Sequence, residues 1–358
     1  MSKPDCVLYS ALREAVPIID AALDKIVRLT GGFHAVSSDP SKQAEVDDFV
    51  RNVKVGANLR GLRQFANIYL DSLLTYGNAV GEVIPDTMGS DIYALYNADP
   101  SNVHILPGKT VLESQICIVN RQGKPEPVKH PDLVFFTPLN PPAGEIRGVS
   151  LLRSLPFVSS IFLKIMQSLG VNFERIANLR YAVTYKPGNS GVDKAYARDI
   201  ADNIASEWSN AMNSVKNGDI RDFVAIGDVD IKVIGADNQM IDTEVPVRQI
   251  LEQIIAKLGI PPFMLGLHWS STERMSVQQA DILTSELESY RYLLEGVLLR
   301  IFEIWRRLRG YGAAVSIVWD DINLQDLVEE ANARLINARA EQIECELKEG
   351  EKNETNAD

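Results

Sequence analysis

The sequence predicts an α+β protein in which a mixed N-terminal part is followed by long helices. Three observations support this fold class. Apolar residues recur at steps of three and four over the first 30 residues and again beyond residue 150, which is the spacing of helices. Between residues 79 and 138 the apolar runs are short and separated by Pro, Gly, Asn and Asp, which is typical of strands and turns. The 358 residues, 46% of them hydrophobic, can bury cores in two or three structural units.

The N-terminal part is expected to form one domain of two helices and a sheet. Helical spacing runs over residues 4 to 30 and ends at Gly31-Gly32, a typical C-cap. A second helix is expected over residues 59 to 76, closing at Gly77. Short runs such as AVGEVI, IYALY and DLVFFTP then predict a mostly antiparallel sheet over residues 79 to 138.

Two further helices bracket a small block of mixed structure. The apolar pattern over residues 151 to 176 predicts one helix of roughly 30 residues, about 45 Å long at 1.5 Å per residue. Residues 181 to 239 predict a strand, a helix near 194 to 215, and two strands at DFVAIG and DIKVIG. A second helix, over residues 247 to 258, is stopped by Gly259 and Pro261-Pro262.

The double proline is followed by a turn, a polar loop and another long helix. IPPFMLG predicts a stiff apolar turn, and residues 267 to 276 are polar and lack a strand pattern. Ser276 and Gln279 have the spacing of a capping box and predict a helix start. An apolar stripe then continues for about 33 residues, with a kink expected at Gly296.

Charge and composition limit the possible partners. The net charge is −12, and residues 320 to 358 hold twelve acidic residues against four basic ones. An acidic chain is poorly suited to gripping DNA, because affinity for phosphates comes mostly from Lys and Arg. No apolar run reaches the length of a bilayer span and no signal peptide is present, so a soluble chain made in a cytoplasm is expected. Cys6, Cys117 and Cys345 are far apart in sequence and are expected to be reduced thiols.

No catalytic, cofactor or metal site is predicted. The GKT run at residues 108 to 110 lacks the earlier glycine of a phosphate loop, because that position is Val103. Ser150 and Ser190 do not complete a nucleophile elbow and are expected in surface loops. Asp320-Asp321 is expected to form a turn or a helix cap. The histidines have no partner at metal-ligand spacing and are expected to be ordinary side chains: His34, His104, His130 and His268.

Three stretches resemble the portal proteins of long-tailed, siphovirus-type double-stranded DNA bacteriophages. RQILEQIIAKLGIPPFMLG resembles the helix and turn of that family, LLTYGNAVGEVI its helix-to-strand junction, and HPDLVFFTPLNPPAGEIRGVSLL the start of its next helix. The order of the three agrees over roughly residues 60 to 310. Leu151 stands where the family often has Pro, and Phe135-Phe136 replace Ile-His. The matching residues are Tyr76, Gly77, Asn78 and Ala79; Asp132, Gly148, Ser150 and Leu152; and Ile260, Pro261, Pro262, Leu265 and Gly266.

The resemblance implies a phage portal fold with named regions. It places an α/β wing at residues 1 to 149, a two-helix stem at 150 to 180 and 240 to 262, and a small α/β clip at 181 to 239. A tunnel loop is expected at 263 to 275. A long kinked tunnel helix and a wing return strand are expected at 276 to 325, and a short C-terminal helical crown with an acidic tail at 326 to 358.

The resemblance also implies a non-enzymatic function without cofactors. Portal proteins form a ring, expected here to be a dodecamer, at one capsid vertex of the virion, after assembly in the host cytoplasm. Double-stranded DNA passes through the ring during packaging and ejection. The expected partners are further copies of the chain, the terminase large subunit, the major capsid or scaffold protein and a head-to-tail adaptor, with no membrane contact. The residues predicted to approach the DNA are His268, Trp269, Ser270, Ser271, Thr272, Glu273 and Arg274.

Two other functions remain open from the sequence. A non-catalytic helical scaffold or adaptor would carry the same amphipathic stripes, since such helices also bind partners. An enzyme with a degraded site would require titratable groups in a pocket, which the sequence does not indicate. Trp269 has two interpretations, packing against a neighbouring subunit or filling a hydrophobic site in its own subunit.

Overall fold

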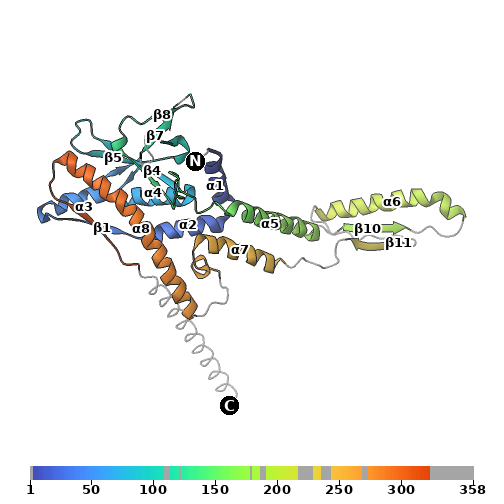
Figure 1. The fold of residues 1–358 in the computed structure, drawn as a ribbon. Helices are drawn as coiled ribbons and strands as arrows, with labels where there is room; N and C mark the ends of the chain where they lie inside the picture. Colours follow the sequence, from blue (N-terminus) through green and yellow to red (C-terminus); the bar gives the residue numbers. More distant parts are fainter. Residues whose placement is uncertain are drawn as a thin grey trace, which may run out of the picture. The chain divides into compact units, whose positions relative to one another are not determined.

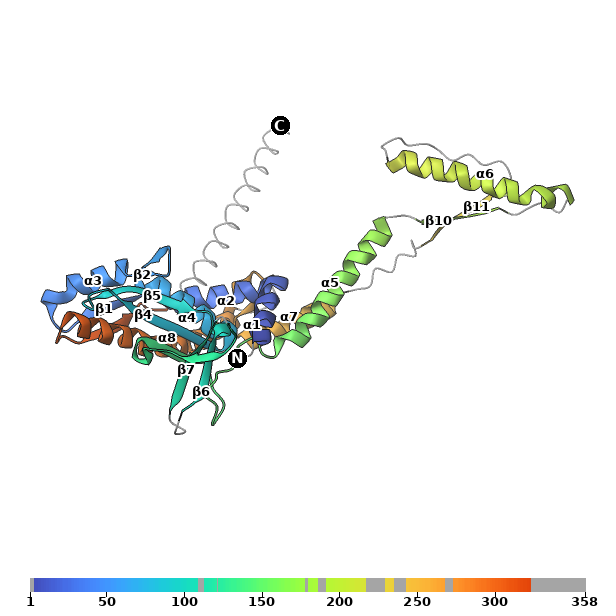
Figure 2. The same ribbon diagram turned by 90° about the horizontal axis from the view of Figure 1, so that it is seen from above.

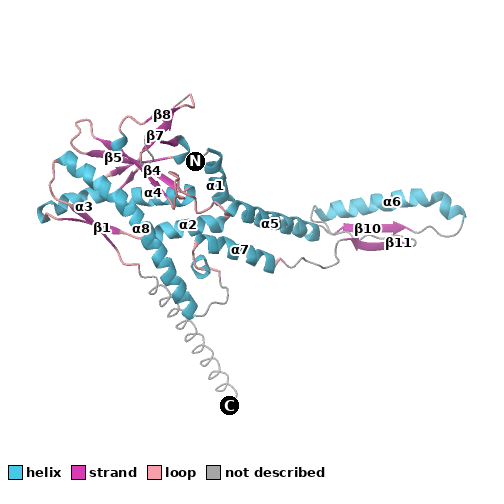
Figure 3. Ribbon diagram, in the orientation of Figure 1, coloured by secondary structure: helices cyan, strands magenta, loops and turns pink. Residues whose placement is uncertain are grey.

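The computed structural model describes residues 3–108, 113–120, 122–177, 180–185, 191–216, 229–234, 243–267 and 273–322 (Figure 1). The chain divides into two compact units. The first unit comprises residues 1–161 together with 248–358, and the second comprises residues 162–247. Helices and strands are both present in each unit, so the predicted α+β class is confirmed (Figure 3).

The N-terminal segment forms two helices, α1 (Lys3–Ala15) and α2 (Pro17–Thr30), where the sequence pattern predicted one. Val16 is fully buried and has a non-helical backbone, and Pro17 occupies the first turn of α2. A proline cannot supply the amide that continues a helix but fits well at a helix start. The prediction of a single helix over residues 4 to 30 is therefore wrong, although its end at Gly31 is correct.

A short helix, α3 (Gln43–Asn52), follows these two helices in the sequence and was not predicted. Its only buried apolar side chains are Val46 and Phe49, too few to show a period in the sequence. The next helix, α4 (Leu62–Tyr76), ends at Gly77 as predicted but begins three residues late. Residues 59 and 60 instead form a short strand.

The main sheet has five strands in the order β3-β2-β5-β4-β9. All its pairs are antiparallel except β2 with β5, which agrees with the predicted, mostly antiparallel sheet. Helix α4 covers one face, and Gly81 lies under its aromatic side chains, with a Cβ there falling 2.7 Å from Phe65 Cζ. The strands are β2 (Lys54–Val55), β3 (Leu59–Arg60), β4 (Asn78–Pro85), β5 (Ile92–Ala98) and β9 (Val134–Pro138).

A second sheet packs against the other face of the main sheet. Val80 and Val134 of the main sheet share a buried cluster with Val103 and Ile105. In both Figure 1 and Figure 2 this smaller sheet projects away from α2 and α3. Its strands are β6 (Val103–Pro107), β7 (Ser114–Val119) and β8 (Pro125–Pro127), and the short 3-10 helices η1 (Pro40–Lys42), η2 (Pro100–Asn102) and η3 (Pro131–Leu133) precede α3, β6 and β9.

The longest helix, α8 (Glu273–Arg309), begins three residues before the predicted start. Ser276 and Gln279 lie inside it, so the predicted capping box is wrong. Within the described residues the buried Gln279 Oε1 has no hydrogen-bond partner. The helix continues through Gly296, and the kink there stays a prediction. It buries one stripe, which packs against α2 and α4: Ala280, Leu283, Leu287, Tyr290, Leu294, Val297, Leu298, Ile301, Phe302 and Trp305.

A two-stranded ribbon joins the N-terminal and C-terminal segments of the first unit. Strand β12 (Val315–Trp319) returns after α8 and pairs antiparallel with β1 (Phe33–Ser37), about 280 residues earlier in the chain. Phe33 and Trp319 pack edge to face, with ring centroids 5.4 Å apart. The predicted crown and tail, residues 326 to 358, lie outside the described residues.

The second unit contains the expected strand, helix and strand. Strand β10 (Arg180–Tyr185) pairs antiparallel with β11 (Val229–Ile234), and α6 (Gly191–Lys216) lies between them in sequence. The predicted strand DFVAIG lies outside the described residues. Helix α5 (Leu155–Ala177) leads into this unit and is 23 residues long, shorter than predicted, because residues 151 to 154 form turns. The chain leaves through α7 (Glu244–Leu258).

Membrane crossing was tested over the described helices. None of them combines the length and the apolar character that a bilayer span requires.

Candidate functional site

Two of the portal-like stretches meet in one junction. Gly77 ends α4 in the left-handed conformation at φ 74°, and its carbonyl accepts a hydrogen bond from Leu139 N at 2.8 Å. Asn78 Oδ1 accepts another from Gly148 N at 2.9 Å. A Cβ on Gly148 would lie 2.1 Å from Gly77 O, so the two glycines permit a direct contact between backbones. Residues 70 positions apart thus set the path from α4 into β4.

Ser150 fixes the start of α5 and is not the surface serine that the sequence predicted. It is only 4% exposed. Its hydroxyl donates to Thr75 O at 2.6 Å and accepts from Leu152 N at 3.0 Å. Leu151 N also donates to Leu74 O at 3.1 Å. These bonds satisfy backbone groups at two helix ends, so this serine has a structural role rather than a nucleophilic one.

Tyr76 and Asp132, two further residues of these stretches, make contacts outside the junction. Tyr76 Oη lies 2.9 Å from Ser10 Oγ, which ties the end of α4 to α1. Asp132 accepts a hydrogen bond from Arg300 through its backbone carbonyl, at 3.3 Å, so its side chain is not used in that contact. The stretch around the junction therefore connects α1, α4 and α8.

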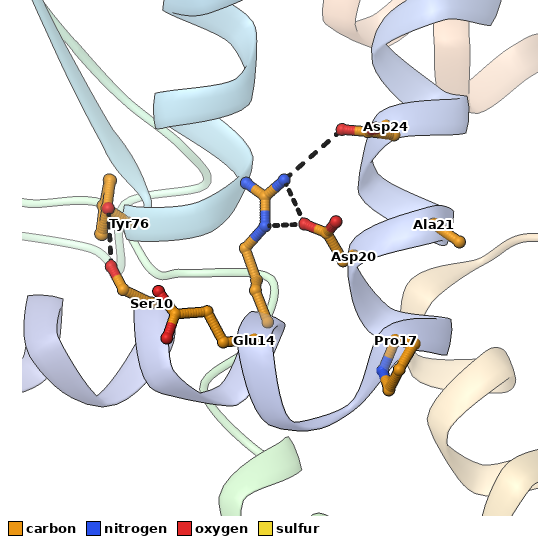
Figure 4. A pocket seen from close by; sticks show the side chains of 8 residues that line it. Ser10, Glu14, Pro17, Asp20, Ala21, Asp24 and Tyr76 are labelled. Carbon is orange, nitrogen blue, oxygen red and sulfur yellow. Dashed lines mark hydrogen bonds and ion pairs between the residues drawn. The ribbon is translucent and has the colours of Figure 1, made fainter.

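A pocket of about 590 Å³ opens beside this junction (Figure 4). Arg13 Nε donates to Asp20 Oδ1 at 2.7 Å, and Arg13 Nη1 donates to Asp71 Oδ1 at 2.7 Å and to Thr75 Oγ1 at 2.8 Å. Burial alone would lower the pKa of Arg13, but the carboxylates of Asp71 and Asp20 outweigh burial and raise it. Figure 4 shows Asp20 and Asp24 on the same side of α2. The lining residues are Ser10, Arg13, Glu14, Pro17, Asp20, Ala21, Asp24 and Tyr76.

The chemistry of this pocket is structural. The Arg13 guanidinium binds carboxylates from two helices, Asp20 of α2 and Asp71 of α4, and so holds α1 against both. The lining contains hydroxyls and carboxylates but no histidine or cysteine to activate a nucleophile. Within the described ranges, no group of three or more His, Cys, Asp or Glu side chains is placed to hold a metal ion.

Arg13→Met is expected to lower the free energy of unfolding by about 2 kcal/mol, because it removes three charge-assisted hydrogen bonds from a largely buried position. Arg28→Met is the matched control, since Arg28 is 79% exposed and lies 3.6 Å from Asp24. That change should stay within about 0.5 kcal/mol. Urea unfolding of both variants measures the difference. Equal losses would show that the buried network contributes nothing specific.

The third portal-like stretch forms a rigid turn. Ile260 is 2% exposed, and η4 (Pro262–Leu265) follows the buried Pro261. Gly266 adopts φ 76°, which only glycine adopts readily, and its amide donates to Phe263 O. Lys25 Nζ of α2 donates to Met264 O at 2.7 Å. The turn is therefore attached to α2.

The predicted tunnel-loop residues fall in two classes. His268, Trp269, Ser270, Ser271 and Thr272 lie outside the described residues. Glu273 and Arg274 are the first residues of α8, so the prediction that the loop extends to residue 275 is wrong. The structure does not bring these seven residues together into a described site. It does define both ends of the segment, the turn at Gly266 and the start of α8.

The same helix, α2, holds α8 in place. Arg291 is 9% exposed, and its Nε donates to Thr30 O at 2.8 Å. Its guanidinium carbon lies 5.2 Å from the centroid of the Trp319 ring. Burial lowers the pKa of Arg291, against the opposing effect of Asp320. Sequence reasoning missed this arginine, because its position in the buried stripe of α8 gives no separate signal.

The exposed surface of α8 between residues 275 and 299 is acidic. Between residues 275 and 299 the sequence contains four acidic residues and one basic residue, Arg291, which is buried. A cationic grip on a polyanion is therefore absent from this described stretch of the helix. The acidic residues are Asp281, Glu286, Glu288 and Glu295.

The remaining candidate groups occupy ordinary structural positions. His34 Nε2 lies 3.2 Å from Asp320 Oδ1, and Asp320 N donates to Gly32 O, so Asp320 extends the strand ladder rather than forming a turn or cap. Cys6 and Cys117 are buried free thiols, and Cys345 lies outside the described residues. Burial raises the pKa of the Cys6 thiol, which makes it less reactive.

Comparison with known proteins gives matches at the level of structure. No protein-family model matches the sequence, and no curated protein matches it. A subunit from the neck of a native gene transfer agent (GTA) particle, computed with C12 symmetry, is 15% identical with a TM-score of 0.56, over 92% of this chain and 88% of that chain. A subunit from the neck of the empty GTA particle, computed with C6 symmetry, is 16% identical with a TM-score of 0.58, over 91% and 87%. An HK97 family phage portal protein from Corynebacterium diphtheriae is 14% identical with a TM-score of 0.43, over 85% and 92%.

These likenesses concern the fold. The chain has the fold of the GTA neck subunits over about nine-tenths of its length.

Proposed function

We propose that this chain is a portal protein, the subunit of a ring at one vertex of a virion through which double-stranded DNA is packaged and ejected. The observation that carries the proposal is the fold likeness to neck subunits of a particle computed with C12 symmetry, which spans 92% of this chain. The portal-like stretches add support, because two of them form one junction and the third anchors the turn before the predicted loop. We expect a ring of twelve copies.

Helix α5 supports self-association. Between Leu155 and Phe173 its only charged residue is Lys164, and apolar side chains are exposed on more than one of its faces. Phe157, Ile161 and Val171 lie within about 80° of the helix circumference at 100° per residue, and Phe157 is 74% exposed. A helix that is apolar all round is normally buried. We propose that the neighbouring copies of α5 in the ring cover it.

Phe157→Asp is expected to abolish the ring while leaving the subunit folded. The aspartate would place a charge in the proposed contact, whereas a surface change in the free subunit costs only about 0.5 kcal/mol. Met88→Asp is the matched control, because Met88 is 86% exposed and sits in the turn between β4 and β5. Light scattering after size-exclusion chromatography gives the particle mass of each variant. If the Phe157→Asp variant still forms intact rings, α5 is not part of the contact between subunits.

The channel chemistry follows from the charge of α8. Double-stranded DNA carries one negative charge per about 1.7 Å of axis, so a cationic wall would bind it tightly and impede sliding. Acidic side chains repel the duplex weakly within a Debye length of about 8 to 10 Å. We propose that the first half of α8 stands behind the channel wall and that residues 268 to 274 approach the duplex. DNA would then slide with low friction.

The proposed partners are assigned to the two units. We propose that residues 181 to 239 of the second unit are the clip, where the terminase large subunit and later the head-to-tail adaptor dock. The wing, in the first unit, would face the major capsid or scaffold protein. Packaging then requires an ATPase from a partner, since the sequence contains no phosphate loop. The assembled ring would belong to the virion.

A further inference from the structure

The two outer edges of the β1–β12 ribbon differ in their hydrogen bonding within the described structure. Asp320 N donates to Gly32 O, and Ser38 N donates to Ala314 O, which fixes the hydrogen-bonded pairs of the ribbon. In an antiparallel pair the residues between such pairs direct their backbone groups to the outside. On the β1 side these residues are Phe33, Ala35 and Ser37. On the β12 side they are Val315, Ile317 and Trp319.

The outer edge of β1 is closed by a side chain. Gln43, the first residue of α3, accepts from Ser37 N at 2.9 Å through Oε1. Its Nε2 donates to Ala35 O at 2.8 Å. A side-chain amide thus reproduces the two hydrogen bonds that a neighbouring strand would make. No further strand can pair with this edge while Gln43 remains in place.

The outer edge of β12 is open within the described structure. No described residue bonds to the backbone of Val315, Ile317 or Trp319 on that side, and β12 pairs with β1 alone. Its sequence, VSIVW, contains no charged residue and no proline. Those are the features that normally protect an exposed edge from pairing with another chain. Among the described residues, the strand therefore has an unpaired edge, and its sequence has high β propensity.

The outward face of the ribbon is also apolar for an exposed surface. Val36 is 43% exposed and Val318 is 51% exposed, and both point to the same side as His34 and Ser316. A two-stranded ribbon is marginal on its own, and a third strand would both extend the ladder and flank these valines. Trp319 Nε1 is buried without a hydrogen-bond partner in the described part of the chain. Within the described residues, the ribbon thus has exposed valines on its outward face and no further strand beside β12.

We propose that β12 receives an extended segment of a second copy of this chain, so that the ribbon gains a strand across each subunit contact. This inference rests on the proposed ring. A ring contact is heterologous, which means that one surface of each subunit meets a different surface of the next. An open edge on one side of a subunit meets that requirement, and strand addition supplies main-chain hydrogen bonds as the source of affinity. The exposed side chains of Val36 and Val318 favour a segment that presents apolar side chains to them.

Hydrogen exchange of the full chain tests the pairing directly. The outward amides of Val315, Ile317 and Trp319 are expected to exchange at least about tenfold more slowly in the assembled ring than in the free subunit. The amides of Ser316 and Val318, which already face β1, serve as the internal reference. Equal exchange of the outward amides in ring and subunit would overturn the inference, even where the ring itself forms.

A pair of variants at one position tests the same contact by assembly. Ile317→Pro removes an amide that faces the open edge and is not used by β1, while Ile317→Ala shortens the side chain and keeps the amide. We expect the alanine variant to form rings and the proline variant to remain a folded subunit, judged by particle mass and thermal melting. Rings from both variants would overturn the inference and leave the portal proposal standing. If the proline variant fails to fold, the hydrogen-exchange result decides. A wild-type chain that never forms rings would overturn both proposals.

Discussion

Gly148→Ala is expected to lower the free energy of unfolding by about 4 kcal/mol or more, enough to leave much of the protein unfolded. The added methyl carbon would stand 2.1 Å from Gly77 O and 2.3 Å from Leu139 N. Both atoms belong to the backbone and are hydrogen-bonded to each other at 2.8 Å. The methyl group can therefore fit only if the junction between α4, β9 and α5 opens. Urea unfolding and the yield of soluble protein measure the effect.

Gly296→Ala is the matched control for this prediction. It is the same substitution, but Gly296 is exposed inside α8, and beyond the local backbone of the helix no described atom lies within 4 Å of the added methyl group. Alanine should stabilise the helix by about 0.5 to 1 kcal/mol, because it has a higher helix propensity. The two variants should thus shift stability in opposite directions. A small effect at Gly148 would mean that the junction is looser than its hydrogen bonds indicate.

Replacing residues 268 to 272 with a Gly-Ser linker of equal length is expected to abolish DNA packaging or retention and leave the ring intact. The structure sets the bounds of the replaced segment, because the preceding turn ends at Gly266 and α8 begins at Glu273. The anchors on α2, through Met264 and Arg291, are outside the replaced segment. A flexible linker retains the chain connection but removes five of the seven side chains proposed to approach the duplex, all except Glu273 and Arg274.

The measurement for this second prediction is the amount of nuclease-protected DNA per particle. The control is a Gly-Ser replacement, again at equal length, of residues 87 to 89, which lie in the turn between β4 and β5. The control should package normally. If the 268 to 272 variant packages DNA fully, that segment does not act on DNA in the channel. Loss of the ring itself would assign the segment to assembly instead.

Local signals explain which elements the sequence predicted well. The end of α4 at Gly77 and the turn at Gly266 were expected, and both glycines adopt the positive φ that such positions require. Pro17 carried an equally local signal for a new helix, but the apolar spacing across it concealed the break. The capping-box spacing at Ser276 failed for the opposite reason. The same residue pattern occurs by chance inside a helix that begins one turn earlier.

Long-range contacts explain what sequence reasoning missed. The pairing of Phe33 with Trp319 and the bond from Arg291 to Thr30 join segments more than 250 residues apart, and no local pattern encodes them. Ser150 was placed at the surface because its neighbours resemble a loop, whereas its burial depends on Thr75 in another helix. The resemblance named the residues of the junction, but only the fold brings them into contact.

The particle mass and symmetry of the purified full-length chain test the central claim most directly. The account predicts a closed ring around a hollow axis, with a mass near that of twelve 39.7 kDa subunits, visible in negative-stain images and measured by native mass spectrometry. Such a ring should form from this chain alone, because the exposed apolar face of α5 requires a partner. A chain that stays a monomer or a dimer at micromolar concentration would contradict the account and favour a helical scaffold or adaptor.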